Sequence, residues 1–121
     1  MNAHKLADQL SVGPAISVKD VKTLAANGFK HIICNLPDGE IANQAIFSQI
    51  KKAAKKEGIE AYYIPVKHGP MNPDNVAKMK EYLDTLDGPI FAYCRSGNRS
   101  SMLYKAANRG EGGGFFKRLF G

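Results

Sequence analysis

The stretch Tyr93-Cys94-Arg95-Ser96-Gly97-Asn98-Arg99-Ser100-Ser101 decides how the rest of the chain is arranged. It follows an apolar run at 89–92, which predicts a buried strand, and it precedes residues 102–107, which predict a helix. A short polar loop between a strand and a helix directs its backbone N–H groups inward, and the helix N-terminus adds partial positive charge. We therefore expect an anion-binding loop with Cys94 at its floor.

The side chains of this loop are typical of nucleophilic chemistry on an anion. Arg99 can offer two parallel N–H donors to a tetrahedral anion. The same positive field would hold Cys94 as a thiolate, with a pKa below the ordinary value of about 8.5. A cysteine at a strand end is most often part of the core, but the polar residues after this one fit an anion site better. We expect five of them to bind the substrate: Arg95, Ser96, Gly97, Asn98 and Ser100.

The remaining sequence alternates helical and strand patterns, apart from a start without a clear period at 1–8. Further strands are predicted at 9–12, 30–36 and 61–66. Helices are predicted at 17–26, at 43–57 and from 72 to about 86. This alternation is typical of an α/β fold with a mainly parallel central sheet flanked by helices. Ligands bind such sheets at the carboxyl ends of the strands. Three loops would meet there: 37–41, 67–71 and 95–99.

The composition predicts one domain followed by a tail. Of the 121 residues, we assign 1–109 to the α/β domain and 110–121, which begins with a Gly-rich stretch, to a flexible tail. The formal net charge is +6, but the dense basic cluster at 51–56 fits a solvated helix face better than a nucleic-acid surface. We therefore expect no nucleic-acid partner. A basic surface would instead attract a small anionic or phosphorylated substrate.

Cysteine usage and hydropathy indicate a cytoplasmic protein. The two cysteines, Cys34 and Cys94, form no CxxC pair, which argues against a disulfide framework and a zinc site and suits a reducing compartment. No apolar run reaches the length of a membrane span, and the N-terminus lacks the apolar core of a signal peptide. We expect no metal and no cofactor, and the sequence leaves the oligomeric state open.

Over nearly its full length the chain resembles one bacterial family. The matching segments are 28–30 followed by Ile32-Ile33-Cys34-Asn35-Leu36-Pro37-Asp38-Gly39-Glu40, the pair Pro65-Val66, and 92–100. On these segments, residues 9–107 are similar to the DUF442 phosphatase family, which includes the phosphatase-like domain of beta-lactamase-hydrolase-like proteins. The resemblance implies a dual-specificity-phosphatase-like fold. It also implies a cysteine-dependent hydrolase of phosphoesters, with Cys94 as nucleophile and Arg99 as oxyanion clamp.

The loop departs from the phosphatase pattern in two ways. Tyrosine and dual-specificity phosphatases carry five residues between the cysteine and the arginine, usually with a histidine before the cysteine. This chain has four residues between Cys94 and Arg99, and Tyr93 replaces the histidine. The four-residue spacing is similar to that of the rhodanese sulfurtransferases, whose cysteine carries a persulfide. Two alternatives therefore stay open: a rhodanese-like sulfurtransferase or persulfide carrier, and a weakly catalytic module that senses an anion or a redox state.

The proton donor is the least defined part of the predicted site. A phosphatase needs an acid for the leaving oxygen, and dual-specificity enzymes place an aspartate roughly where this chain has His68. His68 is one candidate, with an ordinary loop histidine as the alternative. Asp38 is the second candidate, with an Arg99-orienting role or a plain turn as alternatives. Asp74 is expected to serve a helix end.

Two more residues near the loop have alternative roles. Ser100 can hydrogen-bond the Cys94 thiolate and help it leave in the second step, or it can cap the following helix. Cys34 can be a buried structural thiol, or it can form a reversible disulfide with Cys94 that protects the thiolate from overoxidation. The disulfide requires Cα atoms within about 7 Å of each other.

Overall fold

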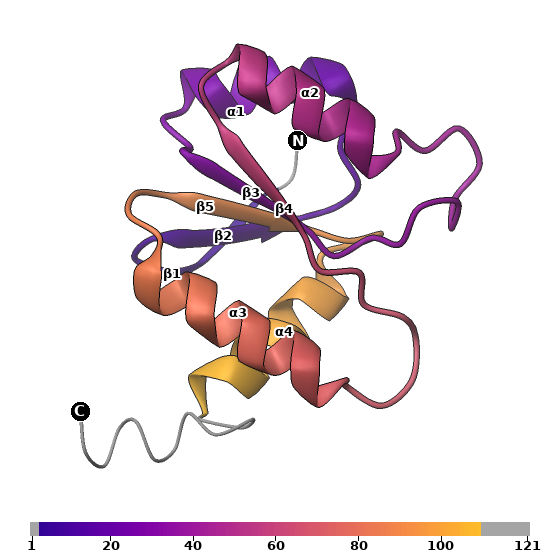
Figure 1. Cartoon of the computed structure of the whole chain (residues 1–121), viewed down its shortest axis with the longest axis vertical. Coiled ribbons are helices and arrows are strands. Elements are labelled where there is room, and N and C mark those ends of the chain that lie inside the picture. The colour runs from indigo at the N-terminus through magenta and orange to yellow at the C-terminus, as the bar shows by residue number, and fades with distance from the viewer. Residues whose placement is uncertain (1–2, 110–121) are drawn as a thin grey trace.

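The computed structural model describes residues 3–109, which form a five-stranded sheet with helices on both faces (Figure 1). The strands are β1 His4–Ala7, β2 Leu10–Gly13, β3 His31–Cys34, β4 Glu60–Tyr63 and β5 Ile90–Tyr93. The helices are α1 Val18–Ala26, α2 Phe47–Lys56, α3 Pro73–Thr85 and α4 Asn98–Asn108. The strand order is β1-β2-β5-β3-β4, with every neighbouring pair parallel except β1 and β2. The predicted α/β fold with a mainly parallel sheet is confirmed.

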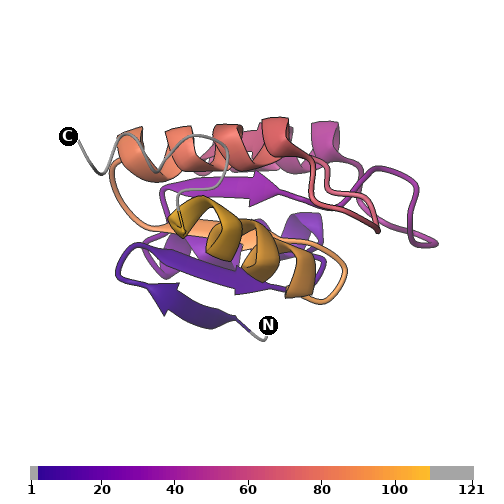
Figure 2. The same cartoon turned by 90° about the horizontal axis from the view of Figure 1, so that it is seen from below.

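The central strands β3 and β5 form the middle of the core. All four residues of β5 are buried, and so are the last three of β3. Parallel strands covered on both faces can be apolar throughout, which explains the unbroken apolar runs in the sequence. Phe91 and Ile32 pack on the face covered by α1 and α2, whereas Ile33 and Ala92 pack on the face covered by α3 and α4. In Figure 2, seen from below, α3 and α4 lie side by side on this second face.

The register between β3 and β5 brings two loops together. Cys34 lies opposite Tyr93 in this parallel pair, so Asn35 and Cys94 leave the sheet next to each other at its carboxyl edge. Asn35 N donates to Tyr93 O at 2.7 Å, which continues the ladder one residue beyond the strand. The loops after β3, β4 and β5 all leave from this edge, on the right of Figure 1, as predicted.

The strand β1 is not indicated by the sequence pattern. It pairs antiparallel with β2 at the edge of the sheet, and its first two residues, His4 and Lys5, are exposed. An exposed edge strand needs no continuous apolar face, so its residues carry no periodic signal.

The start of α2 differs from the prediction by four residues. The helix begins at Phe47 rather than at 43, and the Asp38 carboxylate accepts a hydrogen bond from Phe47 N at 2.8 Å. Asn43 has a φ of 61°, a left-handed conformation that a continuing helix does not tolerate. Residues 43–46 therefore belong to the loop, and the acceptor from an earlier turn decides where the helix starts.

The starts of α1 and α3 agree with the predicted caps. Asp20 Oδ2 accepts a hydrogen bond from Ser17 N at 2.8 Å, as in a capping box. The Asn72 side chain accepts one from Asp74 N at 2.7 Å, and Pro73 is the first helical residue. Asp74 lies in the first turn of α3, as expected for a residue that serves the helix end.

The helix α4 begins at Asn98, four residues earlier than predicted. Gly97 precedes it in a left-handed conformation with a φ of 96° and occupies the capping position. Arg99 and Ser100 therefore lie in the first helical turn. The prediction of Ser100 as the capping residue is wrong, because the chain has already entered the helix there.

The tail predicted at 110–121 lies outside the described residues, so this tail and the domain boundary after 109 stay predictions. Within 3–109, no helix is long and apolar enough to cross a membrane. The lysines of the dense basic cluster are all exposed, which agrees with a solvated face of α2: Lys51, Lys52, Lys55 and Lys56.

Candidate active site

Strand β5 delivers Cys94 to a loop that is tied to the neighbouring strand β2. Cys94 N donates to Gly13 O, and Ala15 N donates to Arg95 O, both at 3.4 Å. Gly97 turns the loop toward α4, and a Cβ at this position would lie 3.4 Å from the Gly13 backbone. Because its φ of 96° would also strain a residue with a side chain, the loop needs glycine here.

The thiol of Cys94 is buried and surrounded by hydrogen-bond donors. Gly97 N donates to Cys94 Sγ at 3.1 Å. Burial by itself would raise the pKa of this thiol, but hydrogen bonds, chiefly from the backbone N–H groups of Ser100 and Ser96, outweigh burial, so the pKa falls below its ordinary value. The geometry thus fits a cysteine that reacts as a thiolate.

The guanidinium of Arg99 is held by two acceptors at the edge of the sheet. Its Nη1 donates to Glu40 Oε1 at 2.9 Å and to Val66 O at 2.6 Å, and its Nη2 donates to Glu40 Oε2. The side chains of Arg99 and Glu40 are only 10% and 18% exposed, so water screens this pair weakly. The hydrogen bond from Arg99 lowers the pKa of Glu40, against the effect of partial burial. A bidentate pair of this kind fixes the plane of the guanidinium.

Asp38 is not the residue that orients Arg99, and this predicted alternative is wrong. Its Oδ1 accepts from Phe47 N and caps α2, while its own N–H donates to Tyr63 Oη at 2.9 Å. The two carboxylates of this turn therefore have different roles: Asp38 fixes the start of α2, and Glu40 binds Arg99.

His68 lies on the exposed loop between β4 and α3. His68 and Arg95 both lie close enough to Glu40 for their charged forms to lower its pKa, after the larger effect of the hydrogen bond from Arg99. His68 is therefore within electrostatic range of the Arg99–Glu40 pair, at the rim of the candidate site. This is a position from which it could reach a group bound by Arg99.

The five predicted substrate-binding residues lie together on the loop and the first turn of α4, but they differ in exposure. Gly97 and Ser100 are buried and can only shape the floor of the loop. Arg95, Ser96 and Asn98 are exposed, so they can contact the part of a substrate that extends out of the loop.

Two residues without a predicted role belong to the site, namely Glu40 and Asn35. Asn35 is fully buried, and its Oδ1 accepts a hydrogen bond from Ser100 Oγ at 2.7 Å. A buried amide rarely occurs without such a partner. The signals for these residues are a polar asparagine directly after an apolar strand and a second carboxylate on the loop that follows it.

Cys34 and Cys94 are both buried free thiols. Cys34 Sγ donates to Leu36 O at 3.3 Å and packs with Tyr93 on the face covered by α1 and α2. Burial raises the pKa of Cys34 to about 11. A thiol that stays protonated at neutral pH reacts poorly in disulfide exchange, which favours the structural role. Its pairing with Cys94 stays a prediction.

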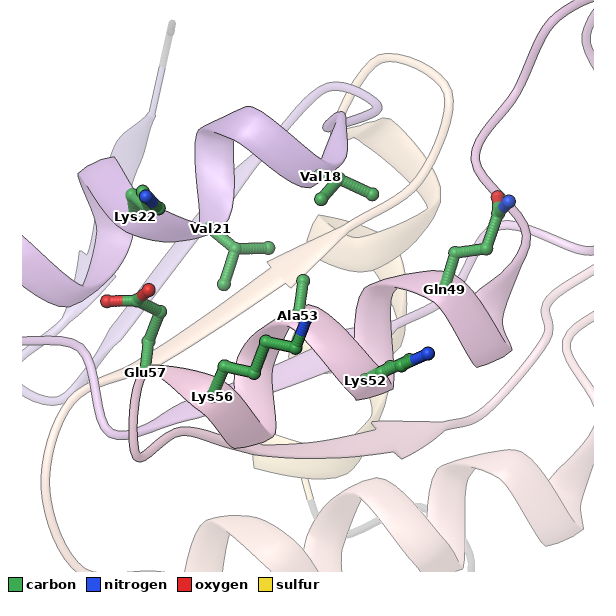
Figure 3. Close-up of a pocket in the computed structure, with 8 residues that line it drawn as sticks. All are labelled: Val18, Val21, Lys22, Gln49, Lys52, Ala53, Lys56 and Glu57. Carbon is green, nitrogen blue, oxygen red and sulfur yellow. The ribbon is translucent and has the colours of Figure 1, made fainter.

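A separate hollow of about 460 Å³ lies between α1 and α2 (Figure 3). It is lined by Val18, Val21, Lys22, Gln49, Lys52, Ala53, Lys56 and Glu57. These residues come from the two helices and the position that ends α2, so the hollow is distinct from the loop that holds Cys94. Across residues 3–109, no three His, Cys, Asp or Glu side chains are grouped so that they could hold a metal ion.

Comparison with known sequences relates this geometry to one family. Residues 2–110 match the family described as "Beta-lactamase hydrolase-like protein, phosphatase-like domain". The Beta-lactamase hydrolase-like protein of Agrobacterium fabrum is 32% identical over 104 residues, which cover 86% of this chain and 24% of that protein. The chain thus spans about a quarter of the length of the curated relatives it matches.

Solved structures agree with this relationship. The crystal structure of a candidate phosphatase from Neisseria meningitidis matches with a TM-score of 0.80 and 32% identity, over 89% of this chain and 77% of that one. A kinase-associated phosphatase with its catalytic-site cysteine substituted by serine matches with a TM-score of 0.68 and 17% identity, over 81% and 63%, which shows the shared fold alone. The expected dual-specificity-phosphatase-like fold is confirmed, and this chain is similar in structure to cysteine-based phosphatases. It belongs to the family of phosphatase-like domains of Beta-lactamase hydrolase-like proteins.

Proposed function

We propose that this domain is a cysteine-dependent hydrolase of phosphoesters. One observation supports it above all: the buried Cys94 thiol, with its lowered pKa, shares a strand–loop–helix unit with an arginine that Glu40 and Val66 hold in a fixed orientation. The two groups provide a nucleophile and an anion clamp on one rigid support. Amide donors at a helix N-terminus complete such a cradle without any metal or cofactor.

The proposed reaction has two steps. In the first, the Cys94 thiolate attacks phosphorus and forms an S–P bond, while the ester P–O bond breaks and its electron pair leaves with the alcohol oxygen. That oxygen takes a proton from His68. In the second, water attacks phosphorus and gives its proton to His68, and the S–P electron pair returns to Cys94. Arg99 and the loop amides stabilise the negative charge on the phosphoryl oxygens in both steps.

A burst assay tests this proposal. Mixing the domain with p-nitrophenyl phosphate should give a rapid release of one equivalent of nitrophenol, followed by steady turnover. Cys94→Ser should abolish both phases, whereas Cys34→Ser should retain them. Continued turnover by folded Cys94→Ser would exclude the cysteine mechanism. The exposed side chains Arg95, Ser96 and Asn98 are the positions at which we expect substrate preference to change.

Sulfur transfer is the second candidate, because the loop is short and the two carboxylates near it are engaged in other contacts. α4 starts directly after Gly97, four residues lie between Cys94 and Arg99, and the nearby carboxylates Glu40 and Asp38 bind Arg99 and the start of α2. In this reaction, Cys94 takes the outer sulfur of thiosulfate, the S–S bond breaks, and sulfite leaves with the electron pair. Cyanide then removes the sulfur as thiocyanate. Formation of thiocyanate and a gain of one sulfur atom in the intact mass would support it.

A further inference from the structure

Asn35 is fixed in place between two strands by its backbone. Its N–H donates to Tyr93 O at 2.7 Å, and its carbonyl oxygen accepts from Val66 N at 2.9 Å. The residue is fully buried, so no water is available to replace a missing partner. The donors and acceptors of the Asn35 side chain must therefore find their hydrogen-bond partners among protein groups.

The side-chain amide of Asn35 has one possible orientation. Its Nδ2 donates to Ile64 O at 2.9 Å, and a carbonyl oxygen can only accept. The NH₂ group must therefore face Ile64, which turns Oδ1 toward Ser100. Because Oδ1 can also only accept, the 2.7 Å contact with Ser100 Oγ requires the hydroxyl proton of Ser100 to lie between these two oxygens.

Ser100 has one hydroxyl proton and two acceptors within reach. One is Asn35 Oδ1, and the other is the sulfur of Cys94, whose thiolate a hydrogen bond from the same hydroxyl would stabilise. The hydroxyl cannot donate to both at once. The backbone N–H of Gly97 stays on the sulfur in either case, at 3.1 Å.

We propose that Asn35 is a positioning residue that holds the Ser100 hydroxyl away from Cys94 in the resting enzyme and releases it when charge returns to the sulfur. The release step rests on the phosphatase reaction proposed above. In the resting state the thiolate keeps one donor fewer, which favours its attack on phosphorus. When water cleaves the S–P bond and the electron pair returns to sulfur, the hydroxyl rotates from Asn35 to Cys94. No proton is transferred in this rotation, since the O–H bond of Ser100 stays intact.

Other charged and titratable groups also act on the thiol. Arg99 approaches it from α4 and Cys34 from the end of β3. Glu40 balances the charge of Arg99, and the charged forms of His68 and Arg95, on the two neighbouring loops, lower the pKa of Glu40. A change at Asn35 leaves all of these groups in place, so the effect of Asn35 on Cys94 should pass through Ser100 alone.

The test is a double-mutant cycle with Asn35→Leu, Ser100→Ala and the combination. The Cys94 pKa is measured from the pH dependence of alkylation by iodoacetamide, with peptide mass spectrometry to identify the labelled cysteine. Leucine has nearly the shape of asparagine but accepts no hydrogen bond, so Asn35→Leu should release the hydroxyl to sulfur and lower the Cys94 pKa by about one unit. Ser100→Ala alone should change it by less than about a third of a unit, and the effect of leucine should vanish in the double variant.

Three results would overturn the proposal: an unchanged Cys94 pKa in folded Asn35→Leu, an equal shift in the Ser100→Ala background, or a rise of about one unit in Ser100→Ala alone. The rise in Ser100→Ala alone is measured without any substitution at Asn35, so the proposal can be tested even if Asn35→Leu does not fold.

Asn75→Leu is the matched control, since the Asn75 amide also donates to a carbonyl after β4, that of Pro65, without contacting Ser100. Alkylation requires no turnover. If the variants show the expected Cys94 pKa values but the protein cleaves no phosphoester, the proposed function is refuted. If the protein shows burst kinetics but the variants do not show these pKa values, the role of Asn35 is refuted.

Discussion

Replacing Glu40 by glutamine should destabilise the domain by about 2 kcal/mol. An exposed ion pair contributes about 0–1 kcal/mol, and removing one partner of a fully buried pair costs about 3–5 kcal/mol. The Arg99 and Glu40 side chains, 10% and 18% exposed, lie between these limits. Arg99 keeps the Val66 carbonyl as an acceptor, and the substituted glutamine would still offer one oxygen. The expected loss of stability therefore lies in the lower half of the interval between these two limits.

The pH dependence of this loss follows from the titration of Glu40. Its pKa in the folded protein lies below the ordinary value of 4.5 because of the hydrogen bond from Arg99. A lowered carboxyl pKa stabilises the folded state above the unfolded pKa, and this contribution disappears as the pH falls through the folded value. The difference in unfolding free energy between wild type and Glu40→Gln should therefore be complete at pH 7 and shrink below about pH 4.5.

Urea denaturation at pH 7 and at acidic pH measures this difference, and phosphate titration separates positioning from charge. Removing a negative charge beside the anion should leave the affinity for inorganic phosphate equal or tighter, whereas kcat should fall about tenfold because the guanidinium loses its two-point contact and is held less tightly. Lys80→Gln is the control. It breaks a 2.8 Å helical pair with Asp84 away from the site, and should cost about 0.5 kcal/mol without a kinetic effect. A Glu40→Gln variant as stable as wild type, or equally weakened at every pH, would refute the reasoning.

Three other changes test the site. At pH 7, iodoacetamide should label Cys94 and spare Cys34, because the pKa of the first is lowered and that of the second is raised to about 11; equal labelling in peptide mass spectra would contradict both assignments. Gly97→Ala should lower the unfolding free energy in urea by about 1 kcal/mol, since its φ of 96° strains an L-residue; unchanged stability would mean that the loop adapts. His68→Asn should slow the first step on alkyl phosphates by about tenfold or more and spare the burst of nitrophenol, a leaving group that needs no acid; a burst slowed as much as the cleavage of alkyl phosphates would remove His68 as the proton donor.

The sequence predicts those parts of the fold that depend on local patterns. The buried strands β3 and β5 are continuous apolar runs, and the caps Ser17 and Asn72 mark the starts of α1 and α3. The start of α2 depends instead on a hydrogen bond from Phe47 to Asp38, nine residues earlier, which no local helical pattern encodes. The strand β1 exists because β2 offers it an edge, so its own residues give no signal.

The same distinction explains which parts of the site are visible in the sequence. Cys94 and Arg99 share one loop, so their spacing alone predicts a nucleophile and a clamp. The partners that set their chemistry are distant in the chain: Glu40 lies 59 residues from Arg99, and Asn35 lies 65 residues from Ser100. These contacts depend on the register of β3 against β5, which a single sequence does not state.

The early start of α4 links the short loop to these distant partners. Because the helix begins at Asn98, Arg99 is already helical, and the loop itself has little freedom left to aim its guanidinium. The orientation of the guanidinium is therefore set by residues outside the loop, namely Glu40 after β3 and Val66 after β4. A loop shorter by one residue than that of the tyrosine phosphatases can thus still present a fixed arginine, provided that the sheet register holds these two acceptors in place. The loop length therefore does not by itself decide between phosphoryl and sulfur transfer. The requirement for a proton donor does, because an alkyl oxygen needs one as it leaves and sulfite does not.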